Sequence, residues 1–126
     1  MCYSQFSNQI IEYLLKELEP DFIILFGSIA NGYFREDSDV DIAFFSDKDI
    51  SQYNVFMIAE HLAAKIGRDV DLVDLKKAST VFRAQIIGKG KCIYARNGRK
   101  LAEFKIRVLK EYTLLNEERT PIFEAI

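Results

Sequence analysis

Cysteine, proline and tryptophan are scarce in this chain, which has 2 Cys, 2 Pro and no Trp among its 126 residues. Cys2 and Cys92 are too few for a disulfide scaffold and lack the paired spacing of a zinc site. The low proline content and only 6 glycines exclude a collagen-like fibre and a Pro- or Gly-rich disordered segment.

Long hydrophobic runs are absent as well. No apolar stretch approaches the roughly 20 residues that a membrane-spanning helix requires. Residues 1–5 lack the basic flank and the apolar stretch of a secretory signal. We therefore expect a cytoplasmic protein that has no membrane partner.

The composition of the chain is that of a globular domain, with 49% hydrophobic and 29% charged residues. A chain of this length buries about two thirds of the surface that it exposes when unfolded, which is enough for a stable core without a metal or a cross-link. We expect a single domain that spans residues 1–126.

The net charge of −2 hides an uneven distribution of charge along the chain. Residues 1–75 hold 5 Lys and Arg against 14 Asp and Glu, whereas residues 76–126 hold 12 against 5. Segment 76–110 has eleven basic residues and one acidic residue, Glu103. This segment either binds an anionic partner, such as phosphate, nucleic acid or an acidic protein surface, or neutralises the acidic half within the same fold.

Hydrophobic periodicity predicts alternating helices and strands. Helices are expected over residues 4–19, 51–66, 79–88 and 101–115, and strands over residues 22–26, 40–45, 70–75 and 92–95. This order, with no internal repeat, predicts the α/β (α+β) class, with a mixed β-sheet flanked by helices.

A pair of acidic residues marks the second predicted strand. Segment 27–41 reads GSIANGYFREDSDVD, so that ten residues separate Gly27-Ser28 from Asp39. Strand alternation places Asp39 and Asp41 on one face, while Val40 points into the core. Neighbouring carboxylates resist joint ionisation unless a divalent cation lies between them, and Mg²⁺ prefers such oxygen ligands.

Two further features accompany this pair. Asp71 is a third acid, inside the apolar segment Val70-Asp71-Leu72-Val73 of strand 70–75, where a carboxylate requires a function. Gly27 permits close approach of the backbone to a phosphate, and Ser28 offers a hydroxyl and an N–H at an expected helix start. The chain contains no Gly-Lys-Ser or Gly-Lys-Thr, so it is not a P-loop protein.

Together, Gly27-Ser28, the pair Asp39 and Asp41, and the later strand acid Asp71 resemble the nucleotidyltransferase superfamily related to DNA polymerase β. The length resembles its minimal nucleotidyltransferases, the MntA-like antitoxins encoded beside HEPN-domain toxins. The resemblance implies the minimal polymerase β-like nucleotidyltransferase fold. It also implies that Gly27 and Ser28 hold the triphosphate of ATP, and that Asp39, Asp41 and Asp71 are catalytic and ligate Mg²⁺.

The resemblance further implies a reaction and a partner. An acceptor hydroxyl attacks the α-phosphorus of ATP, and pyrophosphate leaves. Because 126 residues leave no room for an acceptor-binding domain, the expected acceptor is a tyrosine of a HEPN toxin. Segment 76–110, followed by Phe123 and Ile126, is expected to dock that toxin.

Other functions remain open. The chain could be a non-catalytic antitoxin that neutralises the toxin by forming a complex; Asn31, which stands where the family often has Arg, supports this reading, and the intact acids oppose it. A nucleic-acid binder ranks last, because the aromatic residues of segment 76–110 follow helical core spacing. His61, the single histidine, is expected at the boundary of helix 51–66 and not in catalysis.

Overall fold

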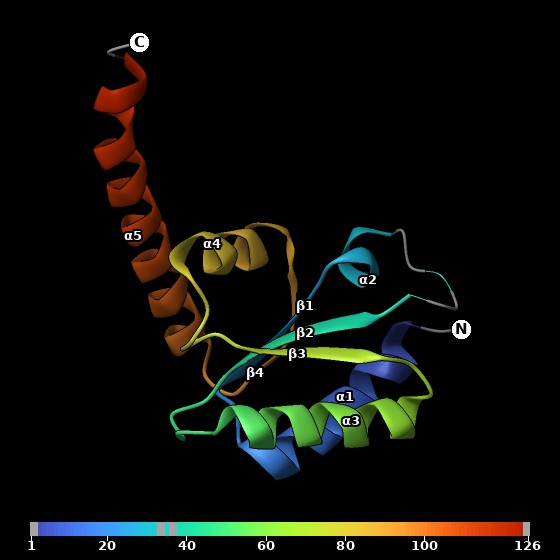
Figure 1. The fold of residues 1–126 in the computed structure, drawn as a ribbon. Coiled ribbons are helices and arrows are strands. Elements are labelled where there is room, and N and C mark those ends of the chain that lie inside the picture. Colours follow the sequence, from blue (N-terminus) through green and yellow to red (C-terminus); the bar gives the residue numbers. More distant parts are fainter. Residues whose placement is uncertain (1–2, 33–34, 36–37, 125–126) are drawn as a thin grey trace.

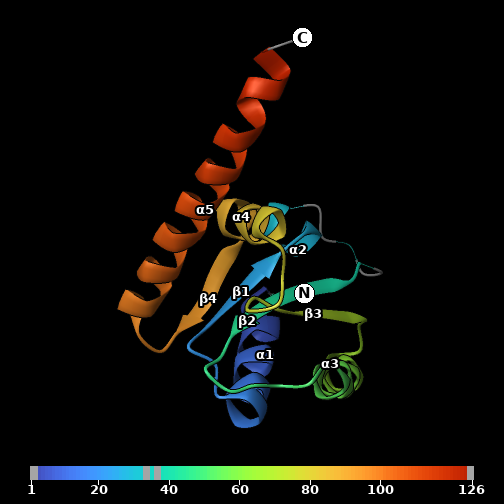
Figure 2. The same cartoon turned by 60° about the vertical axis from the view of Figure 1, so that its left-hand side comes forward.

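The computed structural model describes residues 3–32, 35 and 38–124, and the surroundings of side chains for residues 6–30, 32, 35 and 38–116. Its elements are α1 (Tyr3–Leu18), β1 (Phe22–Phe26), α2 (Ser28–Asn31), β2 (Val40–Phe45), α3 (Gln52–Ile66), β3 (Val70–Asp74), α4 (Thr80–Lys89), β4 (Lys91–Ala95) and α5 (Gly98–Glu124). Figures 1 and 2 show one sheet with helices on both faces, and α5 extending away from the body. In the described part of the chain, no helix has the length and hydrophobicity needed to cross a membrane.

The sheet is mixed, as the sequence predicts, with the strand order β3-β2-β1-β4. β1 runs antiparallel to both β2 and β4, whereas β2 and β3 are parallel. Helix α3 connects these two parallel strands, as a parallel pair requires. The starts of β2 and β3 therefore lie at the same edge of the sheet as the end of β1.

Helices α1 and α3 cover one face of the sheet (Figure 1). Phe6, Ile10, Leu14 and Leu18, which recur every four residues on α1, are buried there. From the sheet, Val40, Ile42 and Phe44 of β2 contribute to the same core, together with residues of α3. Alternation along β2 thus leaves Asp41 on the opposite face.

Helices α4 and α5 pack on that opposite face of the sheet. Phe22 of β1 stacks on Phe45 of β2 with ring centroids 5.3 Å apart, and Phe104 of α5 lies 5.3 Å from Phe22. Ile86 of α4 and Val108 of α5 complete this smaller core. The two cores explain why β2 is apolar on both faces except at Asp41.

The predicted boundaries are confirmed to within two residues, except those of the last helix, which are wrong. Helix α4 continues past Gly88 and ends with the cap residue Gly90. A side chain at Gly90 would lie 2.5 Å from Ile24 Cγ2, so glycine is needed where the chain passes β1. Helix α5 extends well beyond Leu115, to Glu124; of the residues that follow Leu115, segment 117–119 (Glu-Glu-Arg) favours a helix although it carries no apolar stripe.

Candidate active site

Gly27 brings the end of β1 against the Asp41 carboxylate. Phe26, the last residue of β1, pairs in register with Asp41 of β2. Gly27 follows with a φ of 71°, and a Cβ on it would lie 3.0 Å from Asp41 Cγ and still closer to the carboxylate oxygen Oδ2. Only glycine fits both the backbone conformation and this contact. The Gly-Ser motif and the acid are therefore in direct proximity.

The three acids predicted from the sequence meet at the same edge. Asp41 and Asp71 are register partners on the parallel strands β2 and β3, and Asp39 precedes Asp41 by two residues. Burial, followed by the negative charges of Asp71 and Asp39, raises the pKa of Asp41 to about 6. This pKa shows that the protein disfavours the charged form of Asp41 when its surroundings supply no positive charge.

The donor set of this cluster suits a hard cation. Within the residues that the structure describes, none of the three carboxylates forms an ion pair with Lys, Arg or His. Nor is any set of three or more acidic, His or Cys side chains there already arranged at metal-binding distances. The carboxylates thus influence one another electrostatically without converging, as mutual repulsion dictates, and a divalent cation would offset that repulsion.

Ser28 begins the short helix α2 directly beside this cluster. Gly27 caps the helix, and its carbonyl accepts a hydrogen bond from the backbone N–H of Ala30 at 3.1 Å. Gly32 ends α2 with a φ of 78°. The sequence predicted a helix start at Ser28 but not that the helix would stop after a single turn. Half-buried Ser28 follows the residue that touches Asp41.

Arg68 supports the cluster from outside, and the sequence analysis missed it. Its Nη1 donates hydrogen bonds to the backbone carbonyls of Arg35 at 2.6 Å and Ser38 at 3.3 Å, directly before Asp39. Its guanidinium also lies over the Phe6 ring, 5.1 Å from the centroid. The sequence feature that could have indicated a role for Arg68 is its position between the helix cap Gly67 and the strand that carries Asp71.

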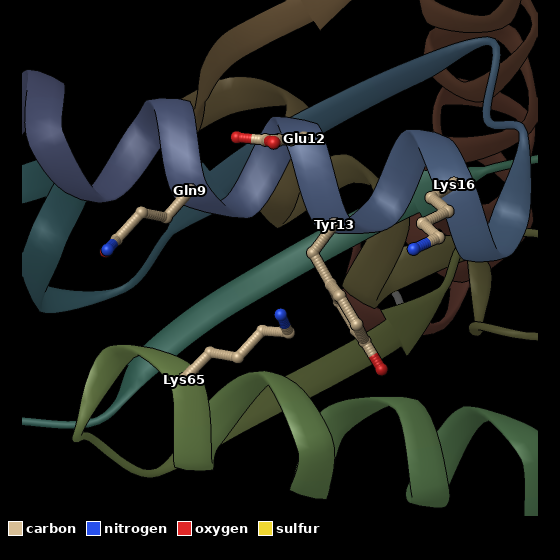
Figure 3. Close-up of a pocket in the computed structure, with 5 residues that line it drawn as sticks. All are labelled: Gln9, Glu12, Tyr13, Lys16 and Lys65. Carbon is tan, nitrogen blue, oxygen red and sulfur yellow. The ribbon is translucent and has the colours of Figure 1, made fainter.

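Two other candidates lie away from the acids. His61 is exposed on α3, which covers the face of the sheet opposite to Asp41. A cavity of about 440 Å³ lies between α1 and α3 and is lined by Gln9, Glu12, Tyr13, Lys16 and Lys65 (Figure 3). There Tyr13 points toward α3, and Lys65 Nζ lies 5.3 Å from the centre of its ring. This cavity brings no acid pair together.

The basic segment 76–110 neutralises part of the acidic half, as one of the two interpretations predicted. Lys100 Nζ forms an ion pair with the buried carboxylate of Asp21 at 3.2 Å and another with the exposed carboxylate of Asp47 at 2.6 Å. Lys76 Nζ donates to the backbone carbonyl of Lys48 at 2.8 Å. These contacts hold the two halves of the chain together. They do not involve the basic residues of α5 that follow Lys100.

Comparison with known proteins identifies the fold and the family. The family model described as polymerase beta, nucleotidyltransferase matches residues 8–99. The protein adenylyltransferase MntA of Shewanella oneidensis is 32% identical over 120 residues, which cover 94% of this chain and 86% of the relative.

Solved structures agree with this assignment. One of a toxin–antitoxin with AMP-PNP is 32% identical, with a TM-score of 0.87 over 94% of this chain and 96% of the other. Another, a tri-AMPylated Shewanella oneidensis HEPN toxin in complex with MNT antitoxin, matches a chain that is 29% identical, with a TM-score of 0.84 over 98% of both chains. The chain therefore belongs to the polymerase β nucleotidyltransferase family and, within it, to the MntA-type adenylyltransferases.

Proposed function

We propose that this protein is an Mg²⁺-dependent adenylyltransferase that transfers AMP from ATP to a tyrosine hydroxyl of a partner HEPN toxin, and so acts as the toxin's antitoxin. Its relatives include the MntA adenylyltransferase and a structure that contains an AMPylated HEPN toxin, which supports both the reaction and the partner. The AMP-PNP in another related structure supports an adenine nucleotide as substrate.

The observation that carries the proposal is the position of Asp41. Its carboxylate touches the Gly27 backbone turn on one side and faces Asp71 across the strand pair on the other. A phosphate held near Gly27 and Ser28 would therefore lie beside the acid cluster. This is the arrangement that phosphoryl transfer requires, because catalysis there depends on positioning and on neutralising phosphate charge.

In the proposed site, Asp39, Asp41 and Asp71 would hold Mg²⁺, which when bound would supply positive charge beside the α-phosphate and the pyrophosphate. The raised pKa of Asp41 fits this assignment, because a cation would relieve the cost of its ionisation. Gly27 leaves room for the phosphate, and Ser28 donates its N–H or hydroxyl to it.

The transfer step forms one bond and breaks another. The tyrosine oxygen of the toxin bonds to the α-phosphorus of ATP, the bond from that phosphorus to the bridging oxygen breaks, and pyrophosphate leaves. We assign Asp71 as the general base that accepts the proton of the tyrosine hydroxyl. Its side chain is exposed at the edge of the cluster, where an acceptor can approach. A reaction that consumes ATP supports a cytoplasmic location.

Intact-mass analysis of the toxin distinguishes the enzyme from a non-catalytic antitoxin. The proposed HEPN toxin partner is co-expressed with wild type, with Asp41→Asn or with the control Asp49→Asn, which changes an exposed acid outside the cluster. We expect the toxin to gain the mass of one or more AMP groups with wild type and Asp49→Asn only. An unmodified toxin that regains ribonuclease activity on separation would identify a binding antitoxin and refute the proposal.

A further inference from the structure

Helix α5 has apolar side chains on two opposite faces. Phe104 and Val108 form the inner face, which is buried on the sheet and α4. Ile106, Leu109 and Leu114 point the other way and are 54%, 54% and 59% exposed. A helix that serves only its own fold needs a single apolar stripe, so the second face is unexplained by the architecture.

The exposed residues form a continuous surface. Ile106, Leu109 and Leu114, together with Lys110 and Thr113, line a shallow hollow of about 500 Å³. The Thr113 hydroxyl donates to the Leu109 carbonyl at 2.8 Å, so its hydrogen bond is made within the helix. We call these five residues the outer face of α5.

The position of the outer face leaves it accessible. Val108 is the last buried residue of α5 among those whose surroundings are described. Both views of the fold show the second half of α5 projecting beyond α4, with no other element of the chain beside it (Figures 1 and 2). With 27 residues, the helix is about 40 Å long, and none of its described residues after Val108 is buried.

Charge selects the kind of partner. Arg107 and Lys110 are exposed, and neither forms an ion pair within the described part of the chain. The nearby acids point elsewhere, since Glu103 pairs with Arg99 and Glu111 lies 3.8 Å from Arg83 on the α4 side. An acidic border on the partner would therefore complement the outer face.

The same charges argue against a second copy of this chain. Two α5 helices packed antiparallel about the centre of the outer face would bring Lys110 against Lys110, and like charges repel at such a contact. Accordingly, we infer that the outer face of α5 docks the HEPN toxin, through an apolar toxin surface bordered by carboxylates. This inference rests on the proposed function and deepens it. Phe123 and Ile126, which the sequence analysis expected to take part, lie outside the residues whose side chains are described.

The test compares charged substitutions on two exposed apolar sites. Leu109→Asp changes the outer face, whereas Phe56→Asp changes a residue of α3 with a similar exposure, 59% against 54%. The toxin is the same HEPN protein that is used for the intact-mass analysis. Three quantities are measured for each variant: binding of the toxin by sedimentation, the toxin concentration that gives half-maximal AMP transfer, and the rise in melting temperature on adding Mg-ATP.

We expect Leu109→Asp to weaken toxin binding by about tenfold or more and to raise the half-maximal toxin concentration in proportion, with the maximal rate and the Mg-ATP response unchanged. Phe56→Asp should match wild type in every measurement. Equal toxin binding by wild type and Leu109→Asp would overturn the inference, as would a loss confined to Phe56→Asp.

Two further outcomes separate this inference from the proposed function. If wild type binds the toxin but transfers nothing, and Leu109→Asp does not bind, the docking surface stands and the enzymatic proposal fails. If the chain alone forms a dimer that Leu109→Asp dissociates, the occupant is a second copy and the inference is wrong. If wild type does not bind the toxin at all, both are refuted.

Discussion

Replacing Asp41 with Asn should make the metal-free protein more stable at neutral and alkaline pH, while abolishing transfer. The pKa of Asp41 rises from 3.8 to about 6 on folding, so the folded state favours the protonated carboxyl. The stability that this preference provides is fully present below pH 3.8 and is lost as the pH rises through 6. Asn has nearly the same shape and stays neutral throughout.

The size of the effect follows from the shift in pKa. Two pKa units correspond to about 3 kcal/mol for a fully buried group. Asp41 remains partly exposed to solvent, which screens the charge and reduces the expected effect to about 1 kcal/mol. For a domain of this length, that difference corresponds to a rise in melting temperature of about 3–5 °C.

Thermal unfolding in the presence of a chelator, at intervals from pH 4 to pH 8, measures this effect. The difference in melting temperature between Asp41→Asn and wild type should be near zero at pH 4 and should reach its plateau above pH 7. Asp49→Asn, which alters an exposed acid away from the cluster, should follow wild type at every pH. A difference that does not depend on pH, or an Asn variant less stable than wild type at pH 8, would refute the electrostatic reasoning.

Three more predictions concern the ligand and the residues around Asp41. Mg-ATP at a hundredfold excess over its Kd should stabilise wild type by about 2.7 kcal/mol, and unchanged melting curves would contradict the nucleotide site. Gly27→Ala should abolish the stabilisation by Mg-ATP, because the added Cβ would displace the Asp41 carboxylate. The control is Gly67→Ala, since Gly67 also has a φ of 71° but a Cβ there would meet no atom within 4 Å. This control should lose about 1 kcal/mol of stability and still be stabilised by Mg-ATP. Arg68→Ala should lower the rate of AMP transfer by about tenfold, because it removes two hydrogen bonds to the backbone carbonyls before Asp39. The control Lys65→Ala also removes a cation from above an aromatic ring and should leave the transfer rate unchanged.

The sequence predicts the strands well because their signals are local. Phe22–Phe26 is an apolar run that Asp21 and Gly27 delimit, and its observed bounds are those predicted. The caps of α3 are equally local, since Ser51 accepts a hydrogen bond from the Asn54 N–H at 3.1 Å and Gly67 closes the helix with a positive φ. Strand bounds and helix caps that depend only on neighbouring residues can be predicted from the sequence without knowledge of the fold.

Features that depend on distant contacts could not be predicted in this way. The need for glycine at position 90, directly after α4, depends on the close approach of the chain to Ile24, some sixty residues earlier. The role of Arg68 likewise depends on carbonyls about thirty residues away in the sequence. The outer face of α5 was missed for a related reason: helical periodicity identifies an apolar stripe but does not show that a second stripe remains uncovered.

The topology of the sheet explains how so short a chain can assemble this cluster. Asp41 and Asp71 are thirty residues apart in sequence, but α3 returns the chain so that β2 and β3 start at the same edge. The antiparallel pairing of β1 with β2 delivers Gly27 to that edge as well. The segments that carry Gly27, Asp41 and Asp71 therefore meet at one edge of the sheet. Asp41 lies on the face of the sheet on which α4 and α5 pack, and we assign the binding of the acceptor protein to the outer face of α5.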